Sequence, residues 1–156
     1  RQFSNLDNIT CHKMTTGVEI IRQCPDLSAF IAGSGTGGTL MGVNQMLKIA
    51  RKNTKIIQVQ PEESNATHGI QGINDGEDFL LDKSIVDETI FIKTKEAVAR
   101  AKRLAKEKGL LVGISSGANI LAAEQWVAEN NPENPVVTIL CDRGERYFSC
   151  FEDYIE

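Results

Sequence analysis

Apolar residues along the chain occur either in short continuous runs or at helical spacing. Short runs bounded by glycine, proline or polar residues are typical of strands buried in a sheet. The predicted strands are Ala29–Ala32, Lys55–Gln60, Ile90–Ile92, Leu110–Val112 and Val136–Leu140. The last run is continuously β-branched and apolar, so we expect that strand to be buried on both faces.

Helical spacing predicts the segments Val18–Gln23, Thr39–Lys52, Lys95–Lys108 and Ala118–Glu129. We expect Thr94 to cap the third helix and Gly109 to end it. The polar stretch Glu62–Lys83 is predicted to be a functional loop or to carry a short element. Strands that alternate with helices predict an α/β fold, with an open, mostly parallel sheet and helices on both faces.

Charge and cysteine usage narrow the class of protein. The 156 residues fit one domain, and the net charge of -4 argues against a general nucleic-acid binder. No apolar run is long enough to span a membrane, and the first residues lack a signal-peptide pattern. Four cysteines without metal-type spacing and only two histidines predict no metal site and reduced thiols in a cytoplasmic chain.

A glycine-rich turn, Gly33–Thr39, lies between a predicted strand and a predicted helix. The free N–H groups of a helix N-terminus bind phosphate, and glycines let the backbone approach it. Gly33, Gly35 and Gly38 also satisfy the dinucleotide pattern G-x-G-x-x-G, and Glu62 follows the next strand. An NAD-type site is therefore a rival, although hydroxyls on both sides of the turn suit one terminal phosphate better.

A second motif, Gly113–Gly117, carries two serines at another predicted strand-to-helix junction. Either Ser115 or Ser116 could simply cap the following helix. Alternatively, because ligands of α/β sheets bind beyond the carboxyl ends of the strands, both turns could line one crevice. A serine hydroxyl could then meet a ring nitrogen while the first turn holds a phosphate.

Several motifs, taken together and in order, resemble the cysteine synthase family of fold-type-II pyridoxal 5'-phosphate enzymes, which includes cystathionine β-synthase. The segments are Gln2–Asn5, Thr15–Ile20, Gly35–Thr39, Gln60–Glu63, Gly69–Ile73, Gly113–Ala118 and Cys141–Ser149. This resemblance favours pyridoxal 5'-phosphate over NAD. It implies that residues 1–156 form the C-terminal, cofactor-phosphate-binding domain of a longer enzyme, whose Schiff-base lysine lies in an N-terminal domain outside this chain.

The resemblance also implies roles for particular residues. The cofactor would be bound by Gly35, Thr36, Gly37, Gly38, Thr39 and Ser115, with Ser115 at the pyridine nitrogen. Gly72 would lie beside the substrate, the alternative being a plain turn in the long loop. A neutral hydroxyl at the ring nitrogen favours β-elimination, which fits the family reaction of O-acetylserine and sulfide to give cysteine. Relatives form homodimers and can bind serine acetyltransferase.

The sequence also departs from the family pattern. Val18 replaces a usual proline, and Asn74–Glu77 replaces a small, glycine-rich stretch. No lysine occupies the family's lysine context, so no catalytic residue is assigned within this chain and we expect the fragment alone to be inactive. Gln71 favours an acetyl ester over a phosphorylated serine, and the short segment after Glu63 is closer to the B-type isoform.

Three alternatives stay open beside a cysteine synthase. The parent protein could be another β-replacement enzyme, such as cystathionine β-synthase. The G-x-G-x-x-G match supports an NAD-binding oxidoreductase domain. A non-catalytic assembly module is the third, although a parallel sheet cut in half would leave an exposed apolar edge.

Overall fold

The computed structural model describes residues 1–50, 52–64, 69–70, 72–74 and 79–152. The elements are α1 (Asp7–Met14), α2 (Thr16–Gln23), β1 (Ala29–Gly33), α3 (Gly38–Ile49), β2 (Lys55–Pro61), η1 (Lys83–Ile85), β3 (Glu88–Ile92), α4 (Thr94–Lys108), α5 (Ile114–Asn130), β4 (Val136–Thr138), η2 (Gly144–Tyr147) and α6 (Phe148–Glu152). In this part of the chain the strands form one sheet in the order β3-β2-β1-β4. All neighbouring strands in it are parallel, which confirms the predicted fold class.

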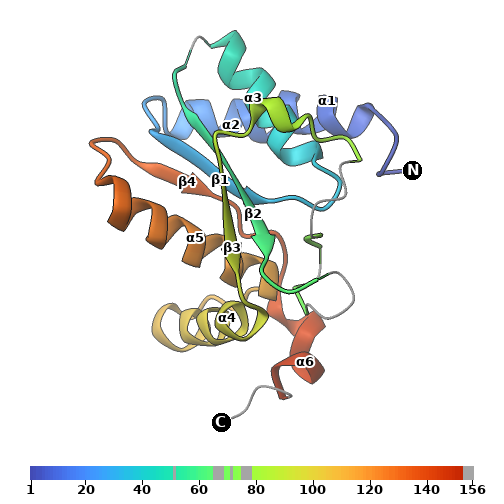
Figure 1. Ribbon diagram of the computed structural model, residues 1–156, viewed down its shortest axis with the longest axis vertical. Coiled ribbons are helices and arrows are strands. Elements are labelled where there is room, and N and C mark those ends of the chain that lie inside the picture. Colours follow the sequence, from blue (N-terminus) through green and yellow to red (C-terminus); the bar gives the residue numbers. More distant parts are fainter. Residues whose placement is uncertain (51, 65–68, 71, 75–78, 153–156) are drawn as a thin grey trace.

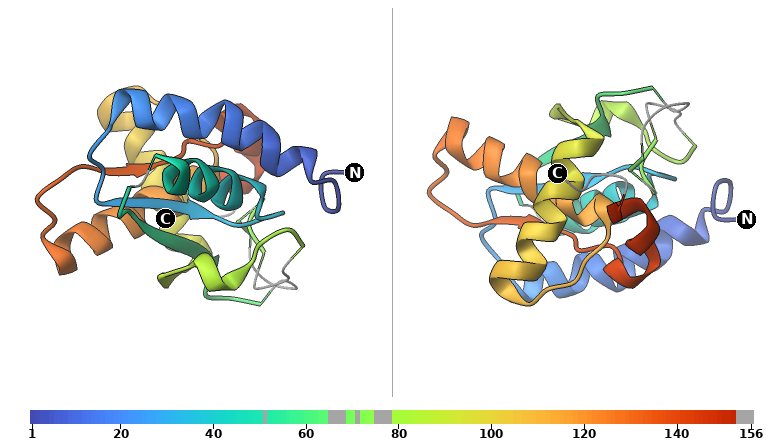
Figure 2. Two further views of the ribbon diagram at one scale, coloured as in Figure 1. Left: turned by 90° about the horizontal axis from the view of Figure 1, so that it is seen from above. Right: turned by 90° about the horizontal axis from the view of Figure 1, so that it is seen from below.

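Helices cover both faces of the sheet (Figure 1). Successive side chains of a strand point to opposite faces, and the central strands bury apolar side chains on both faces. Phe30 and Ile56 pack with α2 and α3 on one face. Ile31 and Ile57 pack with α4 and α5 on the other. Figure 2 views the molecule from these two sides: α3 lies in front of the sheet when it is seen from above, and α4 lies in front when it is seen from below.

The strand predictions were right at the centre of the sheet and wrong at one edge. Val136–Leu140 was expected to be buried on both faces. In the structure β4 ends at Thr138, lies at the sheet edge beside β1 and is only half buried. Leu110–Val112 is not a sheet strand either. Val112 makes a single antiparallel bridge to Arg143 and packs with Ala101 and Leu104 of α4, so burial alone explains its apolar character.

Helix α1 was not predicted. Its sequence is mostly polar, and Ile9 is its buried residue, so it lacks the apolar stripe of a surface helix. The helix lies across α3, where Gly42 allows close approach. A Cβ at Gly42 would lie 2.6 Å from the Ile9 carbonyl oxygen and 2.7 Å from the Lys13 nitrogen. The position of α1 is therefore determined by tertiary packing.

The start of α4 also differs from the prediction. Thr94 is the first helical residue and Lys93 holds the cap position. The Thr94 nitrogen donates to both carboxylate oxygens of Glu63, at 2.9 and 3.1 Å. A carboxylate at a helix N-terminus satisfies free N–H groups and opposes the helix dipole. Gly109 ends the helix with a φ of 68°, as predicted.

Helix α5 begins at Ile114, four residues before the prediction, with Gly113 at its cap position. Ser115 and Ser116 therefore lie inside the first turn, which rules out the alternative that one of them simply caps the helix. The Ser116 hydroxyl instead accepts a hydrogen bond from the Cys141 nitrogen at 2.9 Å. This bond ties the start of α5 to the segment that follows β4.

Candidate functional site

The glycine-rich turn connects the end of β1 to the N-terminus of α3. Gly37 caps α3 with a φ of 85°, a left-handed conformation that favours glycine. A Cβ at this position would also lie 2.7 Å from the Leu81 nitrogen. Since the first N–H groups of a helix lack intrahelical acceptors, this turn presents donors and a positive partial charge to an anion.

The segment around Gly72 packs against the glycine turn and is hydrogen-bonded to it. The Asn74 nitrogen donates to the Ser34 carbonyl at 3.1 Å, and the Leu80 nitrogen donates to the Thr36 carbonyl at 2.9 Å. The Asn74 side-chain amide donates to the Gly35 carbonyl. A Cβ on Gly35 would collide with the Gly72 carbonyl oxygen, so the two chain segments touch backbone to backbone.

The hydroxyl oxygen of Thr36 already accepts two hydrogen bonds. Its Oγ1 accepts from the Asn8 Nδ2 at 3.0 Å and from the Gly38 nitrogen at 3.3 Å. A hydroxyl has two acceptor lone pairs and one hydrogen. With both lone pairs occupied, the hydroxyl hydrogen of Thr36 is free to be donated to a ligand anion.

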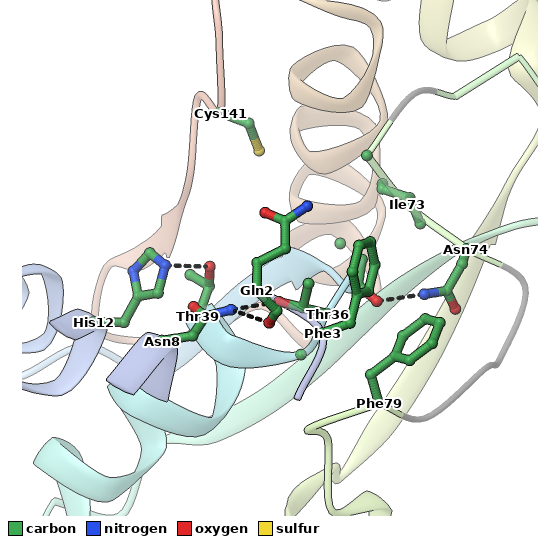
Figure 3. Close-up of a pocket in the computed structure, with 14 residues that line it drawn as sticks. Gln2, Phe3, Asn8, His12, Thr36, Thr39, Ile73, Asn74, Phe79 and Cys141 are labelled. Carbon is green, nitrogen blue, oxygen red and sulfur yellow. Dashed lines mark hydrogen bonds between the residues drawn. The ribbon is translucent and has the colours of Figure 1, made fainter. Parts of the chain in front are cut away.

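Thr39 contacts a histidine from α1 (Figure 3). The Thr39 Oγ1 lies 3.3 Å from the His12 Nε2, and the His12 Nδ1 lies 3.1 Å from the Thr16 Oγ1. Partial burial of the imidazole lowers the pKa of His12 below its ordinary value. The ring is therefore neutral at neutral pH.

Asn8 and His12 were missed by the sequence analysis. They are four residues apart and so share one face of α1. That face rests on Gly38 and Gly42, also four apart, where a Cβ would collide with the Asn8 amide or lie 2.6 Å from the His12 Cβ. Two glycines at this spacing on a predicted helix are a signal of close helix packing, but they do not say which segment fills the space.

The predicted site residues lie around two cavities that share a wall. The first, of about 620 Å³, is lined by Gly35, Thr36, Gly37 and Thr39 of the turn. The second, of about 830 Å³, is lined by Ser115. Gln2, Gly72 and Cys141 line both. Of the other predicted residues, Gly38 is buried beneath Asn8.

An aromatic pair contributes to the first cavity. Phe3 and Phe79 both line it, and their rings meet edge to face with centroids 4.8 Å apart. Such an arrangement is favourable for aromatic side chains. It joins the N-terminal segment to the segment that supports the glycine turn (Figure 3).

The second cavity has polar walls near Ser115. The Tyr147 hydroxyl donates to the Asp142 carboxylate; burial, followed by this bond, raises the pKa of Tyr147 to about 12. Desolvation of the thiol raises the pKa of Cys141, against the opposing effect of hydrogen bonds from Ser115 and Asn119. Cys141 is therefore protonated at neutral pH and is not an activated nucleophile.

Comparison with known proteins places this geometry in a family. The profile described as pyridoxal-phosphate dependent enzyme matches residues 1–142. The chain belongs to that family. Cysteine synthase B of Campylobacter jejuni is 41% identical over 159 residues, which cover 95% of this chain and 52% of that protein. The chain thus spans about half the length of the curated relatives it matches.

The fold of this pyridoxal-phosphate family member is shared with solved structures. The cysteine synthase of Entamoeba histolytica superposes with a TM-score of 0.90 at 37% identity, covering 99% of this chain and 48% of that one. An O-ureido-L-serine synthase superposes with a TM-score of 0.89 at 35% identity, covering 100% of this chain and 53% of that one.

The residues present fit the cofactor of this family. The glycine turn presents the N-terminus of α3 to the cavity that it lines, and the Thr36 hydroxyl is set to donate to an anion. Glu62, the acidic residue that an NAD site would need for a ribose, is exposed and lies 3.7 Å from the Lys93 ammonium.

In the described part of the chain, no lysine lines either cavity. No group of three or more potential metal ligands and no helix able to cross a membrane occurs there either.

Proposed function

We propose that the complete protein containing this chain is a cysteine synthase, which replaces the acetate of O-acetylserine with sulfide to give cysteine and acetate. The observation that supports this most directly is the shared wall of the two cavities. A phosphate-binding turn faces one cavity and Ser115 faces the other. One ligand with a phosphate at one end and a ring nitrogen at the other could use both groups.

In this proposal the glycine turn binds the phosphate of pyridoxal 5'-phosphate. Gly35 and Gly37 let the turn pack closely against Gly72 and Leu81. Gly38 begins the helix whose N-terminus faces the anion, and the Thr36 and Thr39 hydroxyls donate to phosphate oxygens. The bound cofactor supplies an electron sink that stabilises negative charge at the substrate carbon next to the amino group.

Ser115 is proposed to meet the pyridine nitrogen. The side chain is buried, with 4% of the residue exposed, and it carries no charge. A neutral hydroxyl does not force a proton onto the ring nitrogen as a carboxylate would, which favours loss of a leaving group from the β-carbon. Gly72, at the wall between the cavities, is proposed to lie beside the substrate.

We propose that residues 1–156 are the C-terminal domain of this enzyme and that the catalytic lysine lies in an N-terminal domain. The support is the share of relatives that the chain covers and the lack of a lysine among the described cavity-lining residues. A positioned amine is required for covalent catalysis of this type. The isolated fragment is therefore expected to form no cysteine, and detectable product would contradict this assignment.

The assembly and the location of the complete protein are proposed from its similarity to cysteine synthases. We propose a homodimer in the cytoplasm that can associate with serine acetyltransferase. The four cysteines are all free thiols, which suits a reducing compartment. Size-exclusion chromatography of the complete protein, with and without serine acetyltransferase, checks the homodimer and the partner.

The visible absorption spectrum of the complete protein tests the function. A cofactor band that shifts when O-acetylserine is added, and returns when sulfide is added, is the expected result. A cofactor band that shifts with O-acetylserine but does not return with sulfide would point to another β-replacement enzyme, such as a cystathionine β-synthase. Absence of a cofactor band after pyridoxal 5'-phosphate is supplied would contradict the proposed function.

A further inference from the structure

His12 stands between two hydroxyl groups. Its Nε2 lies 3.3 Å from the Thr39 Oγ1, at the glycine turn, and its Nδ1 lies 3.1 Å from the Thr16 Oγ1, at the start of α2. A neutral imidazole carries one N–H donor and one acceptor nitrogen. The ring can therefore connect the two hydroxyls in either of two directions, depending on its tautomer.

The direction decides what Thr39 offers to a ligand. If the proton is on Nδ1, then Nε2 can only accept, and the Thr39 hydroxyl must donate to the histidine. Thr39 then presents lone pairs to the cavity, which repel an anion. If the proton is on Nε2, the histidine donates to the Thr39 oxygen, and the hydroxyl hydrogen of Thr39 is released toward the cavity that it lines.

Thr36 differs from Thr39 in this respect. Two N–H donors, from Asn8 and Gly38, occupy its oxygen, and the Asn8 amide is held in this orientation because its Nδ2 also donates to the Gln2 carbonyl at 2.9 Å. The Thr36 hydroxyl is therefore always oriented to donate. Thr39 has a partner that can donate or accept, so its orientation depends on the proton position in His12.

We propose that His12 is a positioning residue which, as the Nε2–H tautomer, turns the Thr39 hydroxyl toward a phosphate group bound in the glycine turn. The Thr16 hydroxyl then donates to Nδ1, so that three hydrogen bonds run in one direction from Thr16 to the anion. Hydrogen bonds in such a chain polarise one another. The inference rests on the proposed function only in taking that anion to be the phosphate of pyridoxal 5'-phosphate.

The tautomer can be measured directly in the complete protein. Two-bond ¹H–¹⁵N couplings distinguish the two imidazole nitrogens, and the His12 signals are identified by their loss in His12→Gln. We expect the Nε2–H form to predominate when the cofactor-free protein is saturated with inorganic phosphate, and also in the pyridoxal-phosphate-loaded protein. A predominant Nδ1–H form, or an even mixture with phosphate bound, would overturn the inference.

Affinities of matched variants give a second readout. The amide of His12→Gln can still donate to Thr39, so its affinity for pyridoxal 5'-phosphate should stay within about threefold of the wild type. His12→Leu cannot donate and should lose about tenfold. Binding of pyridoxal, which lacks the phosphate, should be unchanged in both variants. An equal loss for both ligands would show a merely structural role and contradict the inference.

The two hypotheses fail in different ways. If the wild type binds neither inorganic phosphate nor pyridoxal 5'-phosphate, the proposed function fails. If it binds them while His12 carries its proton on Nδ1, only the role of His12 fails. The coupling measurement uses wild-type protein and therefore decides the matter even if His12→Leu does not fold.

Discussion

Gly42 of α3 faces His12 of α1 so closely that a methyl group added to Gly42 would lie 2.6 Å from the His12 Cβ. The same added carbon would approach two backbone atoms of α1, the Ile9 oxygen and the Lys13 nitrogen. Backbone cannot move aside as a flexible side chain can. The contact between the two helices therefore depends on glycine at this position.

Replacing this glycine should separate the helices. Gly42→Ala improves helix propensity by about 1 kcal/mol, but forced overpacking costs about 1–3 kcal/mol. We expect a net loss of stability and weaker binding of pyridoxal 5'-phosphate, because Asn8 and His12 move with α1. Chemical denaturation and cofactor titration of the complete protein measure the two effects. Lys48→Ala, at an exposed position of the same helix, is the control and should change neither.

The Thr36 hydroxyl can be tested by a matched pair of substitutions. Thr36→Val keeps the shape of the side chain but leaves the donors of Asn8 and Gly38 without an acceptor. A lost hydrogen bond to a charged group costs about 1.5–3 kcal/mol, so the affinity for pyridoxal 5'-phosphate should fall by roughly 10- to 100-fold. Thr36→Ser restores the hydroxyl and should recover most of it. Equal affinities for the two variants would contradict a role for the hydroxyl.

The depressed pKa of His12 gives a pH dependence of stability. Because burial holds the folded pKa below the ordinary value of 6.5, the neutral ring favours the folded state. This contribution is complete above pH 6.5 and is lost as the pH falls from there through the folded pKa. The free energy of unfolding of the wild type, minus that of His12→Gln, should be constant near pH 8. It should decline below pH 6.5 by at most about 1.4 kcal/mol per pH unit. A difference that stays flat from pH 8 to pH 5 would contradict the burial of His12.

An ion pair between α4 and α5 should matter more than the other surface pairs. The Arg100 side chain is 11% exposed, and its Nε and Nη2 donate to the Glu124 carboxylate at 2.7–3.2 Å. The buried Nη1 has no partner among the described residues. Glu124→Ala removes the carboxylate that accepts these hydrogen bonds, which should cost about 1.5–3 kcal/mol. Asp26→Ala, which removes the exposed partner of Lys52, should cost less than about 1 kcal/mol. Thermal denaturation of the two variants makes the comparison, and equal losses would contradict it.

The sequence predicted the parts of the fold whose apolar pattern is local. Ala29–Ala32 and Lys55–Gln60 are strands within one residue of the prediction, because a central strand buries apolar side chains on both faces. The same reasoning was wrong for Leu110–Val112. Val112 is buried against α4 while Leu110 is 47% exposed, and burial of this kind does not require a sheet partner.

The candidate site was predictable only in part for the same reason. The glycine turn and Ser115 belong to local motifs, so their order along the chain indicated them. Asn8 and His12 reach the turn from a helix whose own residues are mostly polar and whose position depends on glycines about thirty residues away in the chain. The Glu63 carboxylate that caps α4 is likewise 31 residues from its partner. No local pattern contains such pairings.

Because α1 supplies the side chains that contact the turn's hydroxyls, the affinity for a phosphate ester should depend on α1 as well as on the turn. Substitutions at Asn8 or His12 can adjust it while every residue of Gly33–Thr39 stays the same. The affinity for a phosphorylated ligand could therefore be engineered at positions outside the loop. It also means that two relatives with identical glycine turns can differ in how readily they retain the same phosphorylated ligand.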